Sequence, residues 1–191
     1  MQAAAALLAS GAADATIRLW LWQPAEAEQP WQQVGQLEGH TAPVTSLATL
    51  GSTGSAWPAL LVSTAAGVGE VLLWECAGAA GGGGLPAAAA LGAWRLRQRI
   101  DVGSQAQDCA ALAALPADPG WLLLALGGVD SQIRLFASPT GGQFQEACRL
   151  SGHQNWVRGL AFAEMEGERG RWSRSGTNVV EAVPCRPPEG A

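Results

Sequence analysis

An apolar hairpin motif occurs three times in this chain. The three copies align without gaps and read LLASGAADATIRLW ending at Trp20, LLVSTAAGVGEVLLW ending at Trp74, and LLLALGGVDSQIRLF ending at Phe136. Each copy is an apolar strand, a turn of Gly, Ala or Asp, and a second apolar strand. Such a unit buries its apolar faces only against its neighbours, so the repeat predicts an array of stacked β-units.

A Gly-His corner links two of these units to the strands around them. The chain has two histidines, His40 and His153, and each follows a glycine and lies between two strand-like runs. The stretch QFQEACRLSGHQNWVRGLAF, residues 143–162, contains one complete junction of this kind. The unit between the two corners has no Gly-His, so its corner is degenerate.

Length and composition favour one ordinary globular domain. The chain has 191 residues, of which 48% are hydrophobic, and this is enough for a core. Its basic residues are 11 arginines with no lysine, against 16 acidic residues, giving a net charge of −5. This balance gives no overall attraction to nucleic acid or to an anionic membrane surface.

The four cysteines, Cys76, Cys109, Cys148 and Cys185, are far apart and form no C-x-x-C pair. This spacing suggests neither a zinc site nor a compact disulfide framework, and we expect reduced, mostly buried thiols. The N-terminus has no basic region before its apolar run, and no segment has the roughly 20 apolar residues that span a bilayer. We therefore expect a soluble, intracellular chain with no membrane partner.

The repeat resembles the WD-repeat β-propeller family. Gly-His before the first strand and Asp-x-x-[IV]-x-[LV]-[WF] closing the third carry the resemblance, which covers residues 1–163. It implies an all-β, incomplete propeller of about three blades. We expect a Gly/Ala-rich loop insertion at 77–93 and a disordered, atypical tail at 164–191. Three blades cannot close a ring, so we also expect a fragment or an abnormal C-terminus.

In this family a buried network of His, Ser or Thr, Asp and Trp holds each blade. Carried over by position, the network residues are Ser10, Asp14 and Trp20 in the first unit, His40, Thr64 and Trp74 in the second, Asp130 and Phe136 in the third, and His153 at the last corner. Val68 occupies the aspartate position of the second unit. If His40 is buried, we expect the missing carboxylate to leave its ring N–H poorly satisfied, and Val68→Asp to raise the urea midpoint.

Catalytic chemistry has little support in the sequence. Ser10, Asp14 and His40 could form a nucleophilic triad, but the same residue types recur at matching repeat positions, which indicates blade packing. The Gly67-Val68-Gly69 run lacks the third glycine of a dinucleotide fingerprint, and no lysine is present for a phosphate loop. Two histidines in separate repeats are poor metal ligands. We expect no catalytic residues, no cofactor, no metal and no enzyme activity.

Two groups of residues are candidates for partner contact. Arg95, Arg97 and Arg99 alternate along one predicted strand and should project from one face. They form either a solvated outer strand or a basic contact for RNA or an acidic partner. Arg158 beside Trp156 could form a hot spot at a protein interface.

A narrower resemblance is to the WD-repeat subunits of the Elongator complex. It is carried by L-S-G-H-x-x-W-V-R-G-L after a hairpin ending I-R-L-F. It implies an N-terminal propeller segment of a non-catalytic scaffold that supports wobble-uridine modification of transfer RNA. The implied partners are the large scaffold and catalytic subunits, with transfer RNA contacted only indirectly, in cytoplasm and nucleus. The alternatives are a generic adaptor, for a ubiquitin ligase or ribosome assembly, and, more distantly, an enzyme.

Overall fold

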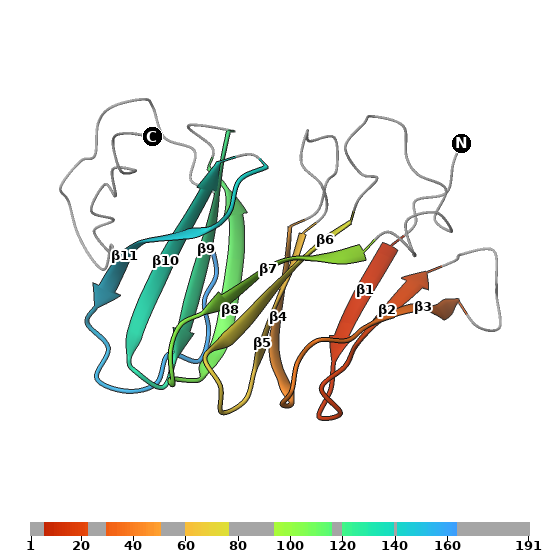
Figure 1. Cartoon of the computed structure of the whole chain (residues 1–191), viewed down its shortest axis with the longest axis horizontal. Coiled ribbons are helices and arrows are strands. Elements are labelled where there is room, and N and C mark those ends of the chain that lie inside the picture. Colours follow the sequence, from red (N-terminus) through yellow and green to blue (C-terminus); the bar gives the residue numbers. More distant parts are fainter. Residues whose placement is uncertain are drawn as a thin grey trace.

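The fold was obtained as a computed structural model, which describes residues 6–22, 30–50, 60–76, 94–115, 120–139 and 141–163. Within these ranges all regular structure is antiparallel β, in three separate sheets (Figure 1). The predicted all-β class and the three incomplete-propeller units are confirmed. The predicted insertion at 77–93 and tail at 164–191 lie outside the described residues.

Each sheet is one blade, with its strands in chain order. Blade 1 contains β1 (Ala6–Gly11), β2 (Ile17–Trp22) and β3 (Trp31–Leu37). Blade 2 contains β4 (Val44–Leu50), β5 (Leu60–Ala65), β6 (Glu70–Cys76) and β7 (Trp94–Asp101). Blade 3 contains β8 (Gln107–Ala114), β9 (Trp121–Gly128), β10 (Gln132–Pro139) and β11 (Gln145–Ser151).

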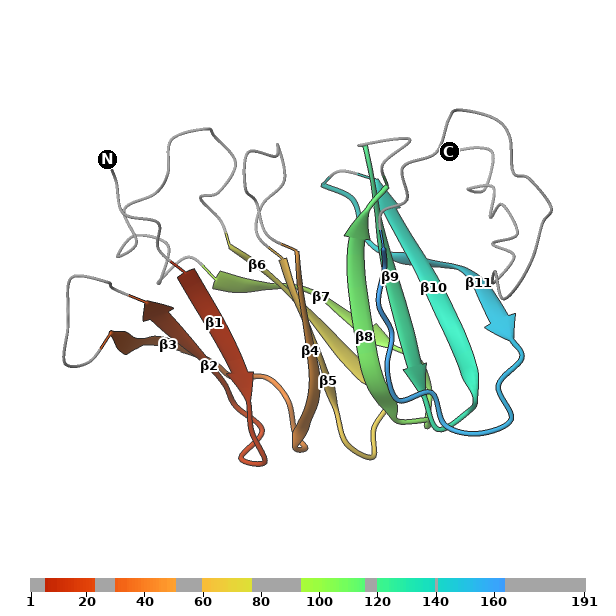
Figure 2. The same cartoon turned by 180° about the vertical axis from the view of Figure 1, so that it is seen from behind.

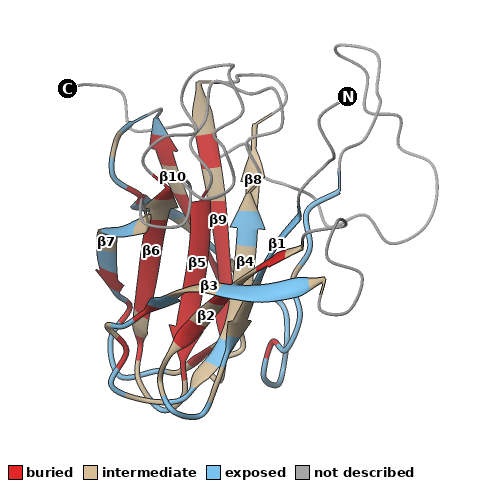
Figure 3. Cartoon of the chain, turned by 90° about the vertical axis from the view of Figure 1, so that its right-hand side faces the viewer, coloured by how far each residue is buried: buried red, intermediate tan, exposed pale blue. Residues whose placement is uncertain are grey.

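The blades stand side by side, so the middle blade is covered on both faces. Strands β1, β4 and β8 follow one another across the molecule, and residues 152–163 run beside β8 and β9 (Figure 2). Strand β5 is buried at every position, and the centres of β5, β6 and β9 are buried in Figure 3. A strand packed on both faces needs an apolar run rather than an alternating one, and LLVSTA meets that need.

Successive residues of the middle blade face opposite neighbours because strand side chains alternate. Leu61 and Leu72 pack against blade 1 with Ile17 and Leu19. The residues next to them pack against blade 3 in a second cluster that includes Leu60, Val62, Leu73, Leu122, Leu124, Leu126 and Phe136. The core is therefore two layers, one at each seam between blades.

The seam that opens a new blade is built twice in the same way. The backbone N–H of Val44 donates to the carbonyl of Ala12 at 3.0 Å, and that of Val157 donates to the carbonyl of Gly128 at 3.0 Å. At both seams a glycine meets the valine: a Cβ on Gly11 would lie 2.4 Å from Val44 Cγ1, and one on Gly127 would lie 2.7 Å from Val157 Cγ1. The predicted junction at 143–162 is therefore a blade seam.

The cysteines only partly follow the expectation of four reduced thiols. Cys76 and Cys109 are buried and are not in disulfides. Cys148 is disulfide-bonded, which corrects the expectation at that position. Burial raises the pKa of the Cys76 and Cys109 thiols, so neither is a reactive thiolate at neutral pH.

Candidate functional site

The largest buried polar group in blade 2 is centred on the hydroxyl of Ser63. Trp74 Nε1 donates to Ser63 Oγ at 2.9 Å, and His40 Nε2 lies 2.7 Å from the same oxygen. Ser63 is 0% exposed and His40 8% exposed. The single hydroxyl of Ser63 thus joins the Gly-His corner to the aromatic residue that ends the hairpin.

A carboxylate lies next to this group, at the start of β6, but forms no hydrogen bond with it. Glu70 Oε2 lies 3.4 Å from His40 Nδ1, and Arg99 forms an ion pair with the other Glu70 oxygen. With the imidazole proton on Nδ1, Trp74 donates to Ser63, Ser63 donates to His40, and His40 faces Glu70. This tautomer places a donor against an acceptor at every contact of the group.

His40 is neutral at physiological pH. Burial first, and then the positive charge of Arg99, lower its pKa from 6.5 to about 4. A neutral ring is the form that can both accept from Ser63 and donate towards Glu70.

Ser63, His40 and Glu70 have the connectivity of a nucleophilic triad, but not its accessibility. A nucleophilic serine must reach a substrate carbonyl, whereas Ser63 has no exposed surface and its oxygen also accepts from Trp74. The arrangement can hold the blade together but cannot attack a substrate. The triad considered from sequence, Ser10, Asp14 and His40, is not assembled, since Ser10 and Asp14 lie in blade 1.

The assignment of Thr64 to the network is wrong by one residue. Ser10 pairs with the residue two before Trp20, and Ser63 pairs with the residue two before Trp74, so the two serines are equivalent. The turn of blade 2 holds one residue more than that of blade 1, which a gapless alignment cannot register. Thr64 is buried and its hydroxyl instead lies 3.0 Å from that of Thr45.

The expectation that Val68 leaves His40 without a nearby carboxylate is wrong, but the expected poorly satisfied ring N–H is confirmed, since the buried His40 Nδ1 has no hydrogen-bond partner. The carboxylate comes from Glu70, two residues further along the chain, at the start of β6. Neither Ser63 nor Glu70 was identified from the sequence. Ser63 could have been found from the sequence, because it is the only serine of its strand and lies next to Thr64.

Blade 1 keeps only part of the predicted set. Trp20 Nε1 donates to Ser10 Oγ at 2.8 Å, as at the equivalent pair of blade 2. Asp14 does not join them: it accepts from the backbone N–H of Thr16 at 3.0 Å and pairs with Arg18 at 3.5 Å. The hydrogen bond from the Thr16 hydroxyl lowers the pKa of Asp14 most. Its role is to stabilise the hairpin turn.

Blade 3 replaces the polar pair with an apolar one. Leu126 occupies the position of Ser63, and Phe136 that of Trp74, and both are buried in the same cluster. Exchanging both partners leaves no orphaned buried donor. Asp130 pairs instead with Arg134 at 2.9 Å, and Arg134 also donates to the Val102 carbonyl at 3.0 Å.

His153 does not belong to a network within the described part of the chain. Its side chain is exposed at the last corner, and the blade that would bury it is not formed by the described residues. The predicted place of His153 in a blade network is therefore not found among the described residues.

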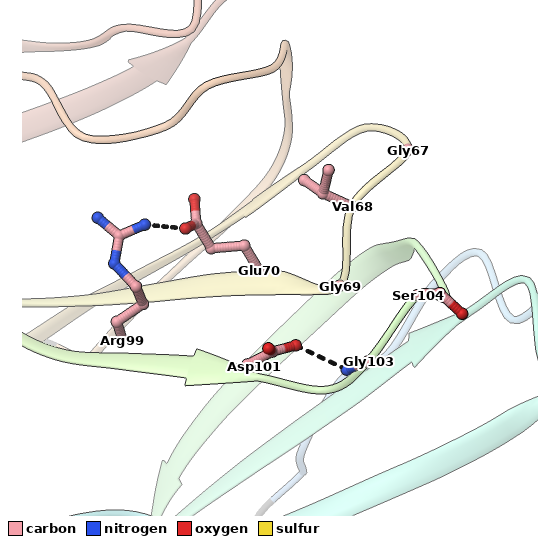
Figure 4. A pocket seen from close by; sticks show the side chains of 8 residues that line it. All are labelled: Gly67, Val68, Gly69, Glu70, Arg99, Asp101, Gly103 and Ser104. Atoms are coloured by element: carbon pink, nitrogen blue, oxygen red, sulfur yellow. Dashed lines mark hydrogen bonds and ion pairs between the residues drawn. The ribbon is translucent and has the colours of Figure 1, made fainter.

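A shallow pocket lies beside the network, where the turn between β5 and β6 meets the end of β7. It is lined by residues 67–70, 99, 101, 103 and 104. Figure 4 shows Glu70 and Arg99 facing each other across it, and Asp101 accepting from the backbone N–H of Gly103, at 2.8 Å. Its charged groups are thus engaged with one another, and the Gly67-Val68-Gly69 turn forms a rim rather than a phosphate loop.

The three arginines of β7 do not form one free basic face. Arg97 is the extra residue of a β-bulge opposite Trp74, and its side chain is only 9% exposed. It contacts Glu75 and donates to the Gly142 carbonyl of blade 3. The predicted alternation fails because a bulge places two residues opposite one and re-aims a side chain.

The flanking arginines remain at the surface but are paired. Arg95 lies 3.2 Å from Glu75, and Arg99 pairs with Glu70. Their side chains are 68% and 47% exposed, and such exposed pairs contribute little to stability. The three arginines of β7 share two glutamates, Glu75 and Glu70, so most of the positive charge of this strand is neutralised and little is presented to RNA.

Trp156 and Arg158 lie on the exposed side of the last seam. Trp156 is 56% exposed and Arg158 is also exposed, while Val157 between them is buried against Gly127. A tryptophan and an arginine flanking this anchored valine form an aromatic and cationic surface that is exposed within the described part of the chain. These are the residue types enriched at binding hot spots.

The described residues contain neither a candidate metal-binding cluster nor a helix that could span a membrane. No group of three or more His, Cys, Asp or Glu side chains is arranged there to hold a metal ion. No helix in the described part of the chain is long and apolar enough to cross a membrane.

The fold, the repeated seam and the Ser–Trp pairs define this chain as a WD-repeat β-propeller protein. A solved structure of Sqt1 from Saccharomyces cerevisiae has the same fold, with a TM-score of 0.52 and 20% sequence identity over 78% of this chain and 34% of that one. No protein-family model matches the chain.

Three curated relatives are named Elongator complex protein 2. The protein of Danio rerio is 30% identical over 163 residues, 84% of this chain and 17% of its own length. That of Arabidopsis thaliana is 42% identical over 64 residues, 34% of this chain and 8% of its length. The protein of Dictyostelium discoideum is 33% identical over 81 residues, which are 39% of this chain and 9% of its own length. The chain is a WD-repeat relative of Elongator complex protein 2, which confirms the resemblance, and it spans at most 17% of these relatives.

Proposed function

We propose that the chain is a non-catalytic scaffold segment of an Elongator complex that supports wobble-uridine modification of transfer RNA. The relationship to Elongator complex protein 2 over 163 residues carries this proposal. The chemistry then belongs to a catalytic subunit, and this chain bridges that subunit and the large scaffold subunit.

The described polar groups support a scaffold role. Ser63 and His40 hold blade 2 together with Glu70 beside them, and the three arginines of β7 share two glutamates, Glu70 and Glu75. Contact with transfer RNA is therefore indirect in this proposal. The exposed surface of Trp156 and Arg158 is the proposed protein contact, because aromatic and arginine side chains dominate hot spots.

Affinity purification of the tagged chain from its source cell tests the proposal. Recovery of the large and catalytic Elongator subunits is the expected result. Recovery of a ubiquitin ligase or of pre-ribosomal particles without Elongator would support the generic adaptor instead, and catalytic turnover by the purified chain alone would contradict a scaffold. Imaging of the tagged chain tests the proposed cytoplasmic and nuclear localisation.

A matched pair of variants locates the contact. Trp156→Ala should reduce recovery of Elongator about tenfold or more, the effect of removing a hot-spot side chain of about 2 kcal/mol. Trp31→Ala removes another exposed tryptophan, 45% exposed, at the far end of the described chain and should leave recovery unchanged. Equal loss in both variants would contradict the assignment of the contact to Trp156.

A further inference from the structure

Blade 1 has an open inner edge. It contains three strands where blades 2 and 3 contain four, and within the described residues β1 pairs only with β2. The pairing of Ser10 with Trp20 makes β1 equivalent to β5, so the strand missing beside it is the counterpart of β4 and β8. Leu7 and Leu8 on this edge are 43% and 49% exposed.

Blade 1 has a sheet edge without a partner strand, whereas residues 157–163 have the sequence of an inner strand but belong to no sheet. Strand β4 reads VTSLATL and residues 157–163 read VRGLAFA, with Val, Leu and Ala at matching positions. The segment has no strand pairing in this structure. Its Phe162 is 39% exposed.

The segment already lies where an inner strand belongs. Val157 is seated at the seam by the same backbone hydrogen bond, and against the same kind of glycine, as Val44 at the start of β4. Cys109 Sγ adds a contact to the Val157 carbonyl at 3.3 Å. Figure 2 shows the segment beyond β8, at the far end of the row of inner strands from β1.

We infer that two copies of this chain complete each other, with residues 157–163 of one copy pairing along β1 of the other. The register follows from β4 on β5, where Ala48 is opposite Val62, and from β8 on β9, where Ala111 is opposite Ala125. By the same alignment, Ala161 of one copy lies opposite Ala9 of its partner copy. Arg158 takes the bulge position held by Thr45 and Asp108.

A second copy suits this edge better than an unrelated strand. The exchange gives each copy three four-stranded blades, and two copies supply six, a number within the range of closed propellers. It covers both exposed ends with seams of a kind already present in the chain. Neither β1 nor the segment places a charge that would repel the other, since β1 is uncharged and Arg158 sits at the bulge. Both contacts are identical, so the pair has twofold symmetry and closes.

Size measured by light scattering after gel filtration of the full 191-residue chain tests the stoichiometry. The expected species has twice the chain mass of 19.6 kDa. A monomer throughout a concentration series, or open assemblies that grow with concentration, would overturn the inference.

Cysteine crosslinking tests the register. A mixture of the Ala9→Cys and Ala161→Cys variants should form a mixed disulfide between copies, which mass spectrometry of the linked peptide identifies. A mixture of Ala9→Cys and Ala163→Cys is the control, two residues out of register and too distant for the bond. Crosslinking of Ala9→Cys with itself would indicate pairing of two β1 strands and would overturn the inference.

A strand-blocking variant tests the donated segment without disturbing the buried core. The double variant L160P/A161P removes two adjacent backbone N–H groups, one of which must face β1. It should convert the dimer to a monomer with an unchanged β-type circular dichroism spectrum. The control L160M/A161S keeps both N–H groups and should stay dimeric. A proline variant that remains a folded dimer would overturn the inference.

Discussion

Replacing Ser63 with alanine is the sharpest perturbation of the blade network. The change removes one hydroxyl that serves two buried ring nitrogens, Trp74 Nε1 at 2.9 Å and His40 Nε2 at 2.7 Å. A buried polar group left without a partner costs about 1–3 kcal/mol. With two such groups sharing one site, we expect Ser63→Ala to lower the free energy of unfolding by about 2–5 kcal/mol.

This loss is large relative to the total stability of a domain, which is about 5–15 kcal/mol. Urea unfolding followed by tryptophan fluorescence measures it, at one fixed protein concentration because association shifts the midpoint. The slope grows with protein size, and with a value of about 2.5 kcal/mol per molar urea, in the upper part of the usual range, the midpoint should fall by roughly 1–2 M.

The control for this experiment is the neighbouring hydroxyl. Thr64→Val keeps the shape of the side chain and removes only the bond to Thr45, so it should cost about 1 kcal/mol. Ser10→Ala, which breaks one half-buried bond to Trp20, should fall in the same range. A Thr64→Val effect as large as that of Ser63→Ala would refute the placement of Ser63 at the centre of the network.

Three further predictions concern the same seams. Acidification from pH 6.5 towards 4 should lower the free energy of unfolding by about 3 kcal/mol, because His40 takes up a proton at a higher pH in the unfolded chain than in the folded chain. A His40→Gln variant should lose this part of the pH dependence. Val68→Asp should not raise the urea midpoint, since Glu70 already faces His40; a clear rise would contradict that role. Gly127→Ala should lower the free energy of unfolding by about 1–3 kcal/mol, because the added methyl group clashes with Val157. Gly152→Ala is the control and should change the urea midpoint little, because Gly152 has open space around it. Equal effects of the two variants would argue against a tightly packed seam.

The repeat made the fold accessible from sequence. Each hairpin carries its own apolar strands and turn, and this local pattern is enough to indicate three stacked β-units. The Gly-His corner likewise located the seam at 143–162, because strand, corner and strand are contiguous in the chain.

Side-chain partners were harder to predict, because one residue decides them. The longer turn of blade 2 moves the network hydroxyl from Thr64 to Ser63, and the nearby carboxylate is that of Glu70 rather than one at position 68. The bulge at Arg97 has the same effect on β7, turning one of three alternating arginines towards the next blade. Side chains alternate with a period of two, so a single inserted residue exchanges the faces of a strand.

Blade 3 replaces both members of the Ser–Trp pair, but only one of the two replacements could be recognised from the sequence. Phe136 in place of tryptophan was evident from the alignment, whereas Leu126 as the matching substitute for serine required the strand register. Together the two apolar residues explain why that blade needs no histidine at its corner. A missing motif residue therefore does not count against the blade when its partner is lost as well.

Native mass spectrometry of the purified chain mixed with the purified large subunit of Elongator tests the proposed scaffold role most directly. The account predicts a mixed complex that contains both proteins and that Trp156→Ala weakens while Trp31→Ala does not. Detection of the two proteins only as separate species, with the wild-type chain folded, would contradict it.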